Sequence, residues 1–137
     1  MHGIARLSAS FPTDPMNPLL VFLGAGIGGV LRHSVNMTAV RFGSSFPWGT
    51  LTINIVGSIA MGLVTGWFAL RGGSMQARLF IATGILGGFT TFSTFSLEAF
   101  SLIERGETVA ALGYIMASLI IGIGGLALGL LLMRQIL

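Results

Sequence analysis

The sequence predicts an all-α membrane protein with four transmembrane helices per subunit, a break in the third helix, and assembly as an antiparallel dual-topology homodimer. Of its 137 residues, 53% are hydrophobic and 8% are charged, and the mean hydropathy is +0.92. Soluble domains carry about a quarter charged residues. Four apolar segments reach the roughly 20 residues that a membrane-spanning helix requires, and a Gly-Gly pair lies within the third of them. These observations place the chain in a lipid bilayer.

Residues 1–18, "MHGIARLSASFPTDPMNP", precede the first apolar segment. They contain one arginine, three prolines and no continuous apolar stretch, so the pattern does not match a signal peptide. We predict a short disordered tail, followed by one four-helix transmembrane domain over residues 19–137. The seven arginines are scattered singly, which argues against a nucleic-acid-binding patch. The chain has no cysteine, which excludes disulfides and thiolate metal sites.

The first two spans are bounded by proline and arginine. Pro18 directly precedes the first span, where proline is well tolerated, and Arg32 and His33 fall in the second half of that span. The second span opens after Pro47 and closes at Arg71. We assign these spans to residues 19–40 and 50–70.

The third and fourth spans flank a short polar turn with the sequence "ERGE". The third span carries "GGFTTFSTFS" in its middle and Glu98 near its end, and the fourth stops at Arg134. We assign these spans to residues 79–103 and 109–133.

The distribution of arginine predicts how the chain inserts into the membrane. With four spans, the N-terminus, the loop between the second and third spans, and the C-terminus lie on one side. Orientation follows the asymmetry of Lys and Arg between the two sides, and here the asymmetry is small, so insertion in both directions is expected. Two opposite orientations allow an antiparallel two-fold dimer. The first side carries Arg6, Arg71, Arg78 and Arg134, and the second carries Arg41, Arg105 and, if it reaches the interface, Arg32.

Small residues recur at four-residue spacing in three of the spans. In lipid, small faces let helix backbones pack closely. Two readings stay open, because such a face serves packing within one subunit or contact between the two subunits of a dimer. The residues are Gly24, Ala25, Gly28 and Gly29 in the first span, Ser58, Gly62 and Gly66 in the second, and Gly125 and Gly129 in the fourth.

The Gly87-Gly88 pair lies about nine residues into the third span, near the bilayer midplane at about 1.5 Å per residue. Each glycine costs about 1 kcal/mol of helix propensity. An irregular backbone at this depth is tolerated only where it faces protein or a water-filled cavity. Unwinding would free carbonyl oxygens, such as those of Gly87 and Thr90, and oxygen ligands suit a hard cation. The alternative is that the glycines serve helix packing.

Five hydroxyl side chains follow within residues 90–96, interleaved with phenylalanine. Phe92 and Phe95 share a face at i and i+3, and Ser93 and Thr94 supply hydroxyl donors beside them. Ring edges are electropositive, so ring edges and hydroxyl protons coordinate a small anion without a full positive charge. Conduction requires binding that is sufficient but weak. Core packing of the rings and bonding of the hydroxyls to the backbone remain the alternatives.

Polar residues of the second and fourth spans are candidates to face the same cavity. Asn54 is the only amide of the second span, with Thr52 two residues earlier, and Tyr114 and Ser118 lie at i and i+4 in the fourth. An amide inside hydrocarbon needs a partner, so an interhelical hydrogen bond is the alternative for Asn54.

Three ionisable residues lie inside or near the spans. An intramembrane arginine is a functional candidate, so Arg32 is predicted to attract anions into a vestibule, although its side chain also has the length to reach the headgroups. Position favours an interfacial placement for Glu98. His33 has no second metal-ligating residue at suitable spacing and receives no role.

Taken together, these stretches resemble the Fluc/CrcB family of fluoride channels from about residue 19 onward. "GGFTTFSTFS" is similar to the third-helix signature of that family, "WGTLTINIVGS" to its second-helix pattern, and "GYIMAS" to its fourth-helix tyrosine and serine. "GAGIGGVLRH" is a looser match to the first helix, because Ala25, Gly29 and His33 depart from the family pattern.

The resemblance implies an antiparallel dual-topology homodimer in the inner (plasma) membrane, with two fluoride pathways that export cytoplasmic fluoride passively and give fluoride resistance. It implies a central sodium ion held by backbone carbonyls matching Gly87 and Thr90 of each subunit. Arg32 matches the arginine of the family's first helix, and Glu98 matches the acid after the signature. The implied pathway residues are Asn54, Phe92 and Phe95 as fluoride ligands, with Thr52, Ser93, Thr94, Tyr114 and Ser118 along the track.

Other classes of function fit the sequence less well. A small dual-topology multidrug exporter needs a membrane-embedded acid, usually in the first span, and residues 19–40 contain no Asp or Glu. A noncatalytic assembly subunit would tolerate replacement of its polar residues by apolar ones. An enzyme is not expected, because the spans contain no paired nucleophile and base.

Overall fold

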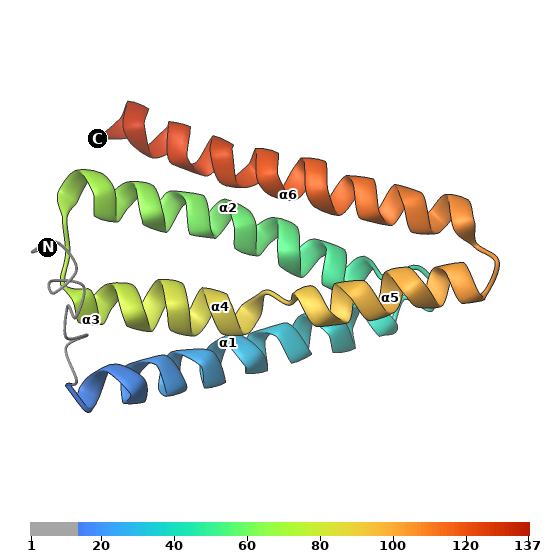
Figure 1. Cartoon of the computed structure of the whole chain (residues 1–137), viewed down its shortest axis with the longest axis horizontal. Helices are drawn as coiled ribbons and strands as arrows, with labels where there is room; N and C mark the ends of the chain where they lie inside the picture. Colours follow the sequence, from blue (N-terminus) through green and yellow to red (C-terminus); the bar gives the residue numbers. More distant parts are fainter. Residues whose placement is uncertain (1–13) are drawn as a thin grey trace, which may run out of the picture.

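The computed structural model describes residues 14–137, and within that range the chain is helical and contains no strand (Figure 1). Four helical stretches are long and apolar enough to cross a membrane. The prediction of four spans is therefore confirmed, with boundaries that differ by a few residues. The stretches are Met16–Val40, Trp48–Arg71, Met75–Glu104 and Thr108–Ile136.

Three of the spans are continuous α-helices, and the third is composite. The continuous helices are α1 (Met16–Val40), α2 (Trp48–Arg71) and α6 (Thr108–Ile136). The third span comprises α3 (Met75–Arg78), the π-helix η1 (Leu79–Leu86), α4 (Gly87–Phe89) and α5 (Phe92–Glu104).

Helix α1 begins earlier than the sequence predicts. The backbone N–H of Met16 donates to Oδ1 of Asp14 at 2.9 Å, and Pro15 is the N-cap. Asp at such a position satisfies an otherwise unpaired amide of the first turn. Residues 16–18 are thus helical, and Asp14 and Pro15 directly precede the helix, although the sequence assigns all five residues to the disordered tail. The remaining residues of that prediction, 1–13, lie outside the described residues.

The helices pack as two pairs that diverge toward the end where the C-terminus lies (Figure 1). α1 packs along η1 and α4, and α2 packs along α6. α5 leaves the first pair and contacts α6, so it joins the two pairs at the opposite end. The third span therefore changes partners partway through the membrane.

Glycine permits the close approach within each pair. A Cβ added to Gly24 would lie 2.5 Å from the carbonyl oxygen of Phe80, and one added to Gly129 would lie 2.6 Å from that of Ile59. Both values are far below van der Waals contact, so the backbones touch directly. The small-residue faces that contain these glycines therefore serve packing within the subunit, which is the first of the two interpretations that the sequence left open. Gly29, by contrast, has nothing within 4 Å of an added Cβ.

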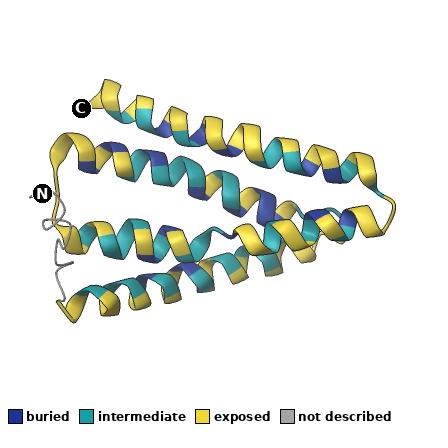
Figure 2. Ribbon diagram, viewed as in Figure 1, coloured by how far each residue is buried: buried dark blue, intermediate teal, exposed yellow. Residues whose placement is uncertain are grey.

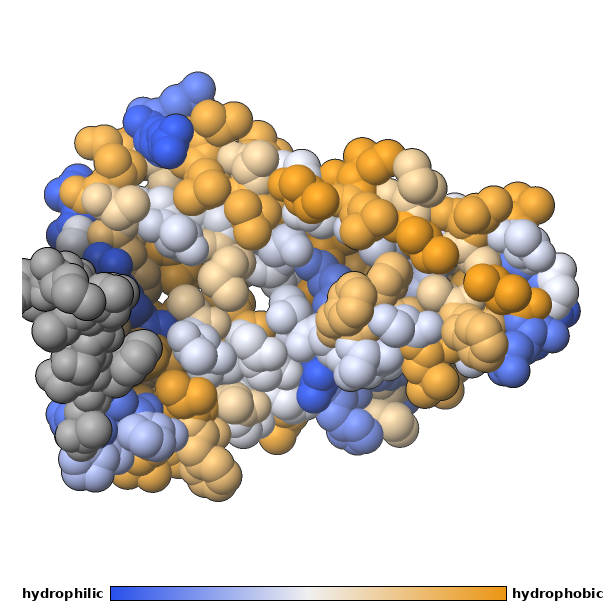
Figure 3. Space-filling view, viewed as in Figure 1, coloured by the Kyte–Doolittle hydropathy of each residue, from blue (hydrophilic) through white to orange (hydrophobic). Residues whose placement is uncertain are grey.

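Burial is confined to the lines of contact between helices (Figure 2). The buried cluster lies where α2, α5 and α6 meet, and the outward faces are apolar and exposed. Figure 3 shows one such face, on which orange atoms cover much of the surface, blue atoms lie at both ends, and pale atoms with a few blue ones lie near the middle. This distribution suits a chain whose outer surface meets lipid. The cluster contains Leu51, Ala99, Leu102, Ala111 and Tyr114.

Candidate functional site

Two residues with extended backbone separate α4 from α5. Thr90 has ψ 157°, and Thr91 has φ −153° and ψ 123°. The glycines before them are helical, and a Cβ on Gly88 would lie 2.5 Å from the carbonyl oxygen of Ala25 on α1. Gly88 therefore serves close packing, and the irregular backbone follows the glycine pair instead of including it.

The side chain of Asn54 on α2 binds both backbone polar groups of Thr91. Its Nδ2 donates to the carbonyl oxygen of Thr91 at 3.0 Å, and its Oδ1 accepts from the backbone N–H of Thr91 at 2.9 Å. Asn54 thus supplies the interhelical hydrogen bond that the sequence offered as one reading. The bond to Thr91 uses one of the two hydrogens on Nδ2.

These bonds remove the usual donors from two carbonyl groups. In a continuous α-helix, the N–H of residue i+4 donates to the carbonyl of residue i. The N–H of Thr91 instead donates to Asn54, and the N–H of Thr94 donates to Oγ1 of Thr91 at 3.3 Å. The carbonyls of Gly87 and Thr90 therefore lose the donors that a continuous helix would give them.

The hydroxyl groups of α5 form a short chain with Thr91. Oγ1 of Thr91 donates to Oγ1 of Thr94 at 3.1 Å and lies 3.4 Å from Oγ of Ser93. Thr91 also acts as the N-cap of α5. The predicted residues Ser93 and Thr94 are thus connected to Asn54 through Thr91.

Glu98 accepts two hydrogen bonds from neighbouring helices. Thr50 on α2 donates to its Oε1 at 2.9 Å, and Tyr114 on α6 donates to its Oε2 at 2.8 Å. Thr50 is 1% exposed and Tyr114 is fully buried. Glu98 is therefore held among three helices and is not a free side chain at the interface.

The aromatic rings form a series that leads from the exposed face of α5 to the buried core. The centroids of Phe92 and Phe95 are 5.7 Å apart, and those of Phe95 and Tyr114 are 5.2 Å apart. Phe92 is 78% exposed in the isolated subunit. Its ring is consequently available to a ligand or to another chain.

Most of these groups border one cavity of about 470 Å³ between α2, the third span and α6. The lining is largely apolar with a few polar groups, the pattern of a small-ligand site. Oγ of Ser118 is buried without a hydrogen-bond partner, an arrangement that calls for a ligand or water. Of the residues predicted from sequence, Asn54, Gly87, Thr90, Phe92, Phe95 and Ser118 line it.

Comparison with known proteins fixes the family. A family profile described as CrcB-like protein, Camphor Resistance (CrcB), matches residues 19–130. This chain belongs to the CrcB family. The resemblance that the sequence motifs carry is thereby confirmed.

Several relatives in the CrcB family carry the name fluoride-specific ion channel FluC. The one from Methylobacterium nodulans is 63% identical over 121 residues, which cover 88% of this chain and 98% of the relative. Relatives from Methylobacterium sp. strain 4-46 and Mesorhizobium japonicum are each 57% identical, with the same coverage of both chains. The similarity therefore extends over nearly the whole length of these CrcB proteins.

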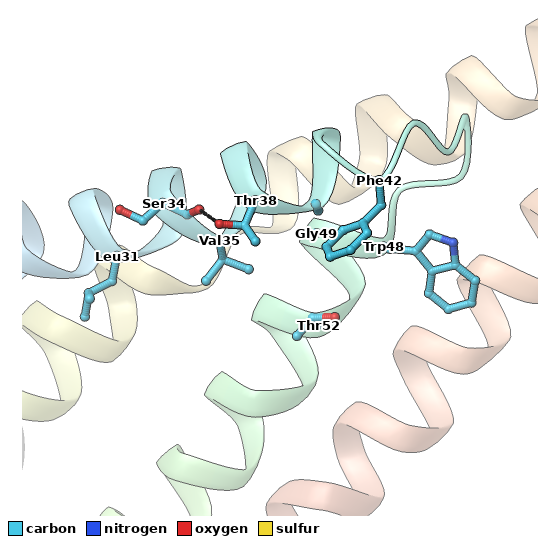
Figure 4. A pocket seen from close by; sticks show the side chains of 9 residues that line it. Leu31, Ser34, Val35, Thr38, Phe42, Trp48, Gly49 and Thr52 are labelled. Carbon is cyan, nitrogen blue, oxygen red and sulfur yellow. Dashed lines mark hydrogen bonds between the residues drawn. The ribbon is translucent and has the colours of Figure 1, made fainter.

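Six of the residues that the CrcB resemblance implies do not line this cavity. Four of them are connected to its lining by the contacts described above, namely Ser93, Thr94, Tyr114 and Glu98. The other two are Thr52 and Arg32. Thr52 lines a separate, largely apolar groove of about 510 Å³ between α1 and α2 (Figure 4). Hydroxyl groups of α1 in that groove bond to their own helix, as Thr38 does to the carbonyl of Ser34 at 2.9 Å. Arg32, on α1, is partly buried and does not line the cavity.

The structure adds Thr50 to the site of this CrcB protein, and it shows the partners of Thr91 and Glu98, which the sequence already named. Helical spacing was the signal for Thr50, because it lies four residues before Asn54 and shares its face, whereas Thr52 lies two residues away and faces elsewhere. Glu98 lies near the end of its span, which favours an interfacial reading. Its inward placement depends on contact with α2 and α6, and no local pattern reveals that contact.

A second cavity of about 310 Å³ connects Thr50 and Glu98 with the end of the molecule. Arg105 borders this cavity, donates to the carbonyl of Ser45 at 3.1 Å, and pairs with Glu107 at 3.0 Å. The partly buried carboxylate of Glu98 thus has a polar approach from the end at which α5 and α6 are joined.

The described residues contain no group of three His, Cys, Asp or Glu side chains suited to a metal ion. Gly87 and Thr90 both line the cavity, and backbone carbonyl oxygens are ligands that suit a hard cation.

Proposed function

We propose that this chain forms a fluoride-selective channel that exports cytoplasmic fluoride passively across the inner (plasma) membrane and gives fluoride resistance. The names of its CrcB relatives support this function. The observation that carries it is the single cavity that Asn54, Phe92, Phe95 and Ser118 share. The protein acts as a channel and not as an enzyme.

The donors at this cavity are neutral, which fits conduction of a small anion. The amide of Asn54 and the unpartnered hydroxyl of Ser118 offer protons, and the two phenyl rings offer electropositive edges. Among residues 14–137, no arginine or histidine lines the cavity. Partial charges offset the cost of removing water from an anion while leaving binding weak enough for release. The membrane potential and any gradient supply the driving force.

Hydroxyl groups continue the pathway from the rings toward the membrane surface. Tyr114 contacts Phe95 and donates to Glu98, which the cavity at the end of the molecule also reaches. Ser93 and Thr94 extend the track along α5. Thr52 lies outside this track, because it lines the separate groove between α1 and α2.

A second copy of the chain completes the site as an antiparallel dimer with two pathways. Phe92 is 78% exposed in one subunit, and a large aromatic ring beside a polar cavity suits an interface between subunits. The near balance of arginines between the two sides supports insertion in both orientations.

A sodium ion at the centre of this dimer would be held by the backbone carbonyls of Gly87 and Thr90 from each subunit. Both residues line the cavity, and their carbonyls lose the usual helical donors because Thr91 and Thr94 donate elsewhere. The ion would fix the two interrupted helices against each other. Arg32 is proposed to attract anions toward the vestibule.

The test is efflux of fluoride from liposomes that contain the purified protein, followed with a fluoride electrode. We expect fluoride efflux with little chloride efflux under the same gradient. Equal efflux of the two anions, or none of either, would contradict the proposed function. Proton-coupled efflux of organic cations would instead favour the multidrug exporter.

The dimer is tested separately by labelling a tag at the C-terminus in intact cells and in permeabilised cells. Labelling of about half the molecules in intact cells is expected if both orientations occur. A single orientation would refute dual topology without bearing on anion selectivity.

A further inference from the structure

One apolar groove has an arginine-rich mouth that the proposed anion pathway does not use. This groove, of about 420 Å³, lies between α2, the start of the third span and the last turns of α6. Its position on α2 differs from that of the pathway cavity: Leu63 and Trp67, at i and i+4, turn away from the face that carries Asn54 and Ser58. The lining residues are Leu63, Val64, Trp67, Phe68, Ala77, Ile81 and Met133.

Three arginines flank the groove at the end where α2 and α6 finish. Arg71 follows Trp67 by one helical turn, Arg78 follows Ala77, and Arg134 follows Met133. All three are exposed. The guanidinium groups thus come from three elements that each contribute to the groove.

The guanidinium of Arg78 is held over this groove. Its Cζ lies 5.3 Å from the centroid of the Phe68 ring, and its Nη2 donates to the carbonyl oxygen of Phe68 at 3.1 Å. A guanidinium carries five N–H hydrogens in a planar fork. One is used by Phe68, which leaves donors for an anionic group beside the apolar groove.

The charge at this end is not balanced by acidic side chains. The chain has four acids, and three of them, Glu98, Glu104 and Glu107, lie on α5 and the turn after it. At that opposite end Arg105 pairs with Glu107 at 3.0 Å. The acid at the arginine-rich end is Asp14, whose Oδ1 accepts a hydrogen bond from the backbone N–H of Met16.

We propose that this groove binds an anionic phospholipid, with an acyl chain along Leu63, Trp67 and Met133 and the phosphate on the guanidinium groups of Arg78 and Arg134. Charge complementarity selects this occupant, since basic pockets between membrane helices recognise anionic headgroups. Trp67 suits the membrane interface, where its ring is half in apolar surroundings. In an antiparallel dimer, one such site would face each leaflet.

The experiment measures quenching of Trp67 fluorescence by lipids with brominated acyl chains. The full-length Trp48→Phe protein, which retains one tryptophan, is reconstituted into phosphatidylcholine vesicles containing brominated phosphatidylglycerol or brominated phosphatidylcholine at equal mole fraction. We expect stronger quenching by the brominated phosphatidylglycerol. Each arginine near an anionic surface contributes about a fivefold preference, so Arg78→Gln or Arg134→Gln should lower the preference about fivefold.

Arg105→Gln is the matched control, because it removes an arginine from the other end of the protein and should keep the preference. Inorganic phosphate at millimolar concentration should not compete, whereas competition would identify a free phosphate site and overturn the lipid proposal. Equal quenching by both lipids in the Trp48→Phe protein would also overturn it. This measurement does not depend on fluoride flux. Its result therefore tests the lipid site independently of the proposed function.

Discussion

The two halves of the third span show how one membrane segment serves two purposes. Before Thr90, η1 and α4 press against α1 with almost no side chain between the backbones, as at Gly24 and Gly88. After Thr91, α5 presents hydrogen-bonding and aromatic side chains to α2 and α6. The first half is fixed by steric contact, and the second is positioned by hydrogen bonds.

The difference separates substitutions that affect folding from those that affect conduction. A larger side chain at a contact of the first half must displace a neighbouring backbone. Removal of a polar side chain at the second half is expected to leave the helices in place. Asn54 connects the two halves because it binds the residue between them. The variants below test this division.

Gly28→Ala is expected to have the largest effect on stability. An added Cβ would overlap the carbonyl oxygen of Ile85 and lie 2.7 Å from the backbone nitrogen of Phe89. Overpacking costs typically 1–3 kcal/mol, and because the neighbours are backbone atoms we expect a loss of about 3 kcal/mol. Thermal unfolding in detergent measures the change.

Gly26→Ala is the control, since an added Cβ there meets nothing within 4 Å. It should leave stability unchanged or raise it by up to about 1 kcal/mol through helix propensity. Equal stability of the two alanine variants would show that the first half is not fixed by backbone contact.

Asn54→Ala is expected to reduce fluoride flux at least tenfold, which corresponds to about 1.4 kcal/mol in the barrier. The variant loses both hydrogen bonds to Thr91 and one donor at the cavity. Hydrogen bonds inside membranes average about 0.6 kcal/mol, so stability should fall by only about 1 kcal/mol. Efflux and thermal unfolding are measured on the same preparation.

Thr52→Ala is the control for Asn54→Ala on the same helix, because Thr52 is exposed and lines the separate groove of Figure 4. We expect flux like that of the unmodified protein. If Thr52→Ala impairs flux as strongly as Asn54→Ala, the hydroxyl of Thr52 belongs to the pathway as the family resemblance implies.

Phe92→Ile should reduce fluoride flux about tenfold while changing the stability of the single subunit by no more than about 0.5 kcal/mol, the usual limit for exposed positions. Its ring is 78% exposed and lines the cavity, so the loss concerns the anion more than the fold of the subunit. Phe100→Ile, at another exposed position of α5 that does not line this cavity, should retain flux. Similar flux in both variants would remove Phe92 from the pathway.

Tyr114→Phe and Thr50→Val should each lose about 0.5–1.5 kcal/mol of stability, which is less than Gly28→Ala loses. Each variant removes one donor to Glu98 and keeps most of the packing. Because the two donors share one carboxylate, the double variant should deviate from additivity by at least about 0.5 kcal/mol. Additive losses in a double-mutant cycle would mean that the carboxylate does not couple the two helices.

The sequence by itself determined the four spans and the family. Each span follows from the length and composition of a local segment, because about 20 apolar residues suffice to cross the bilayer wherever the rest of the chain lies. The motif "GGFTTFSTFS" likewise identifies the CrcB family through contiguous residues.

Only the tertiary structure decided which side chains meet. Asn54 and Thr91 are 37 residues apart, Thr50 and Glu98 are 48 apart, and no local pattern specifies either contact. The irregular backbone falls after the glycines because Gly88 is needed against Ala25 and Asn54 holds Thr91. Packing between helices, which depends on the whole chain at once, fixed these positions.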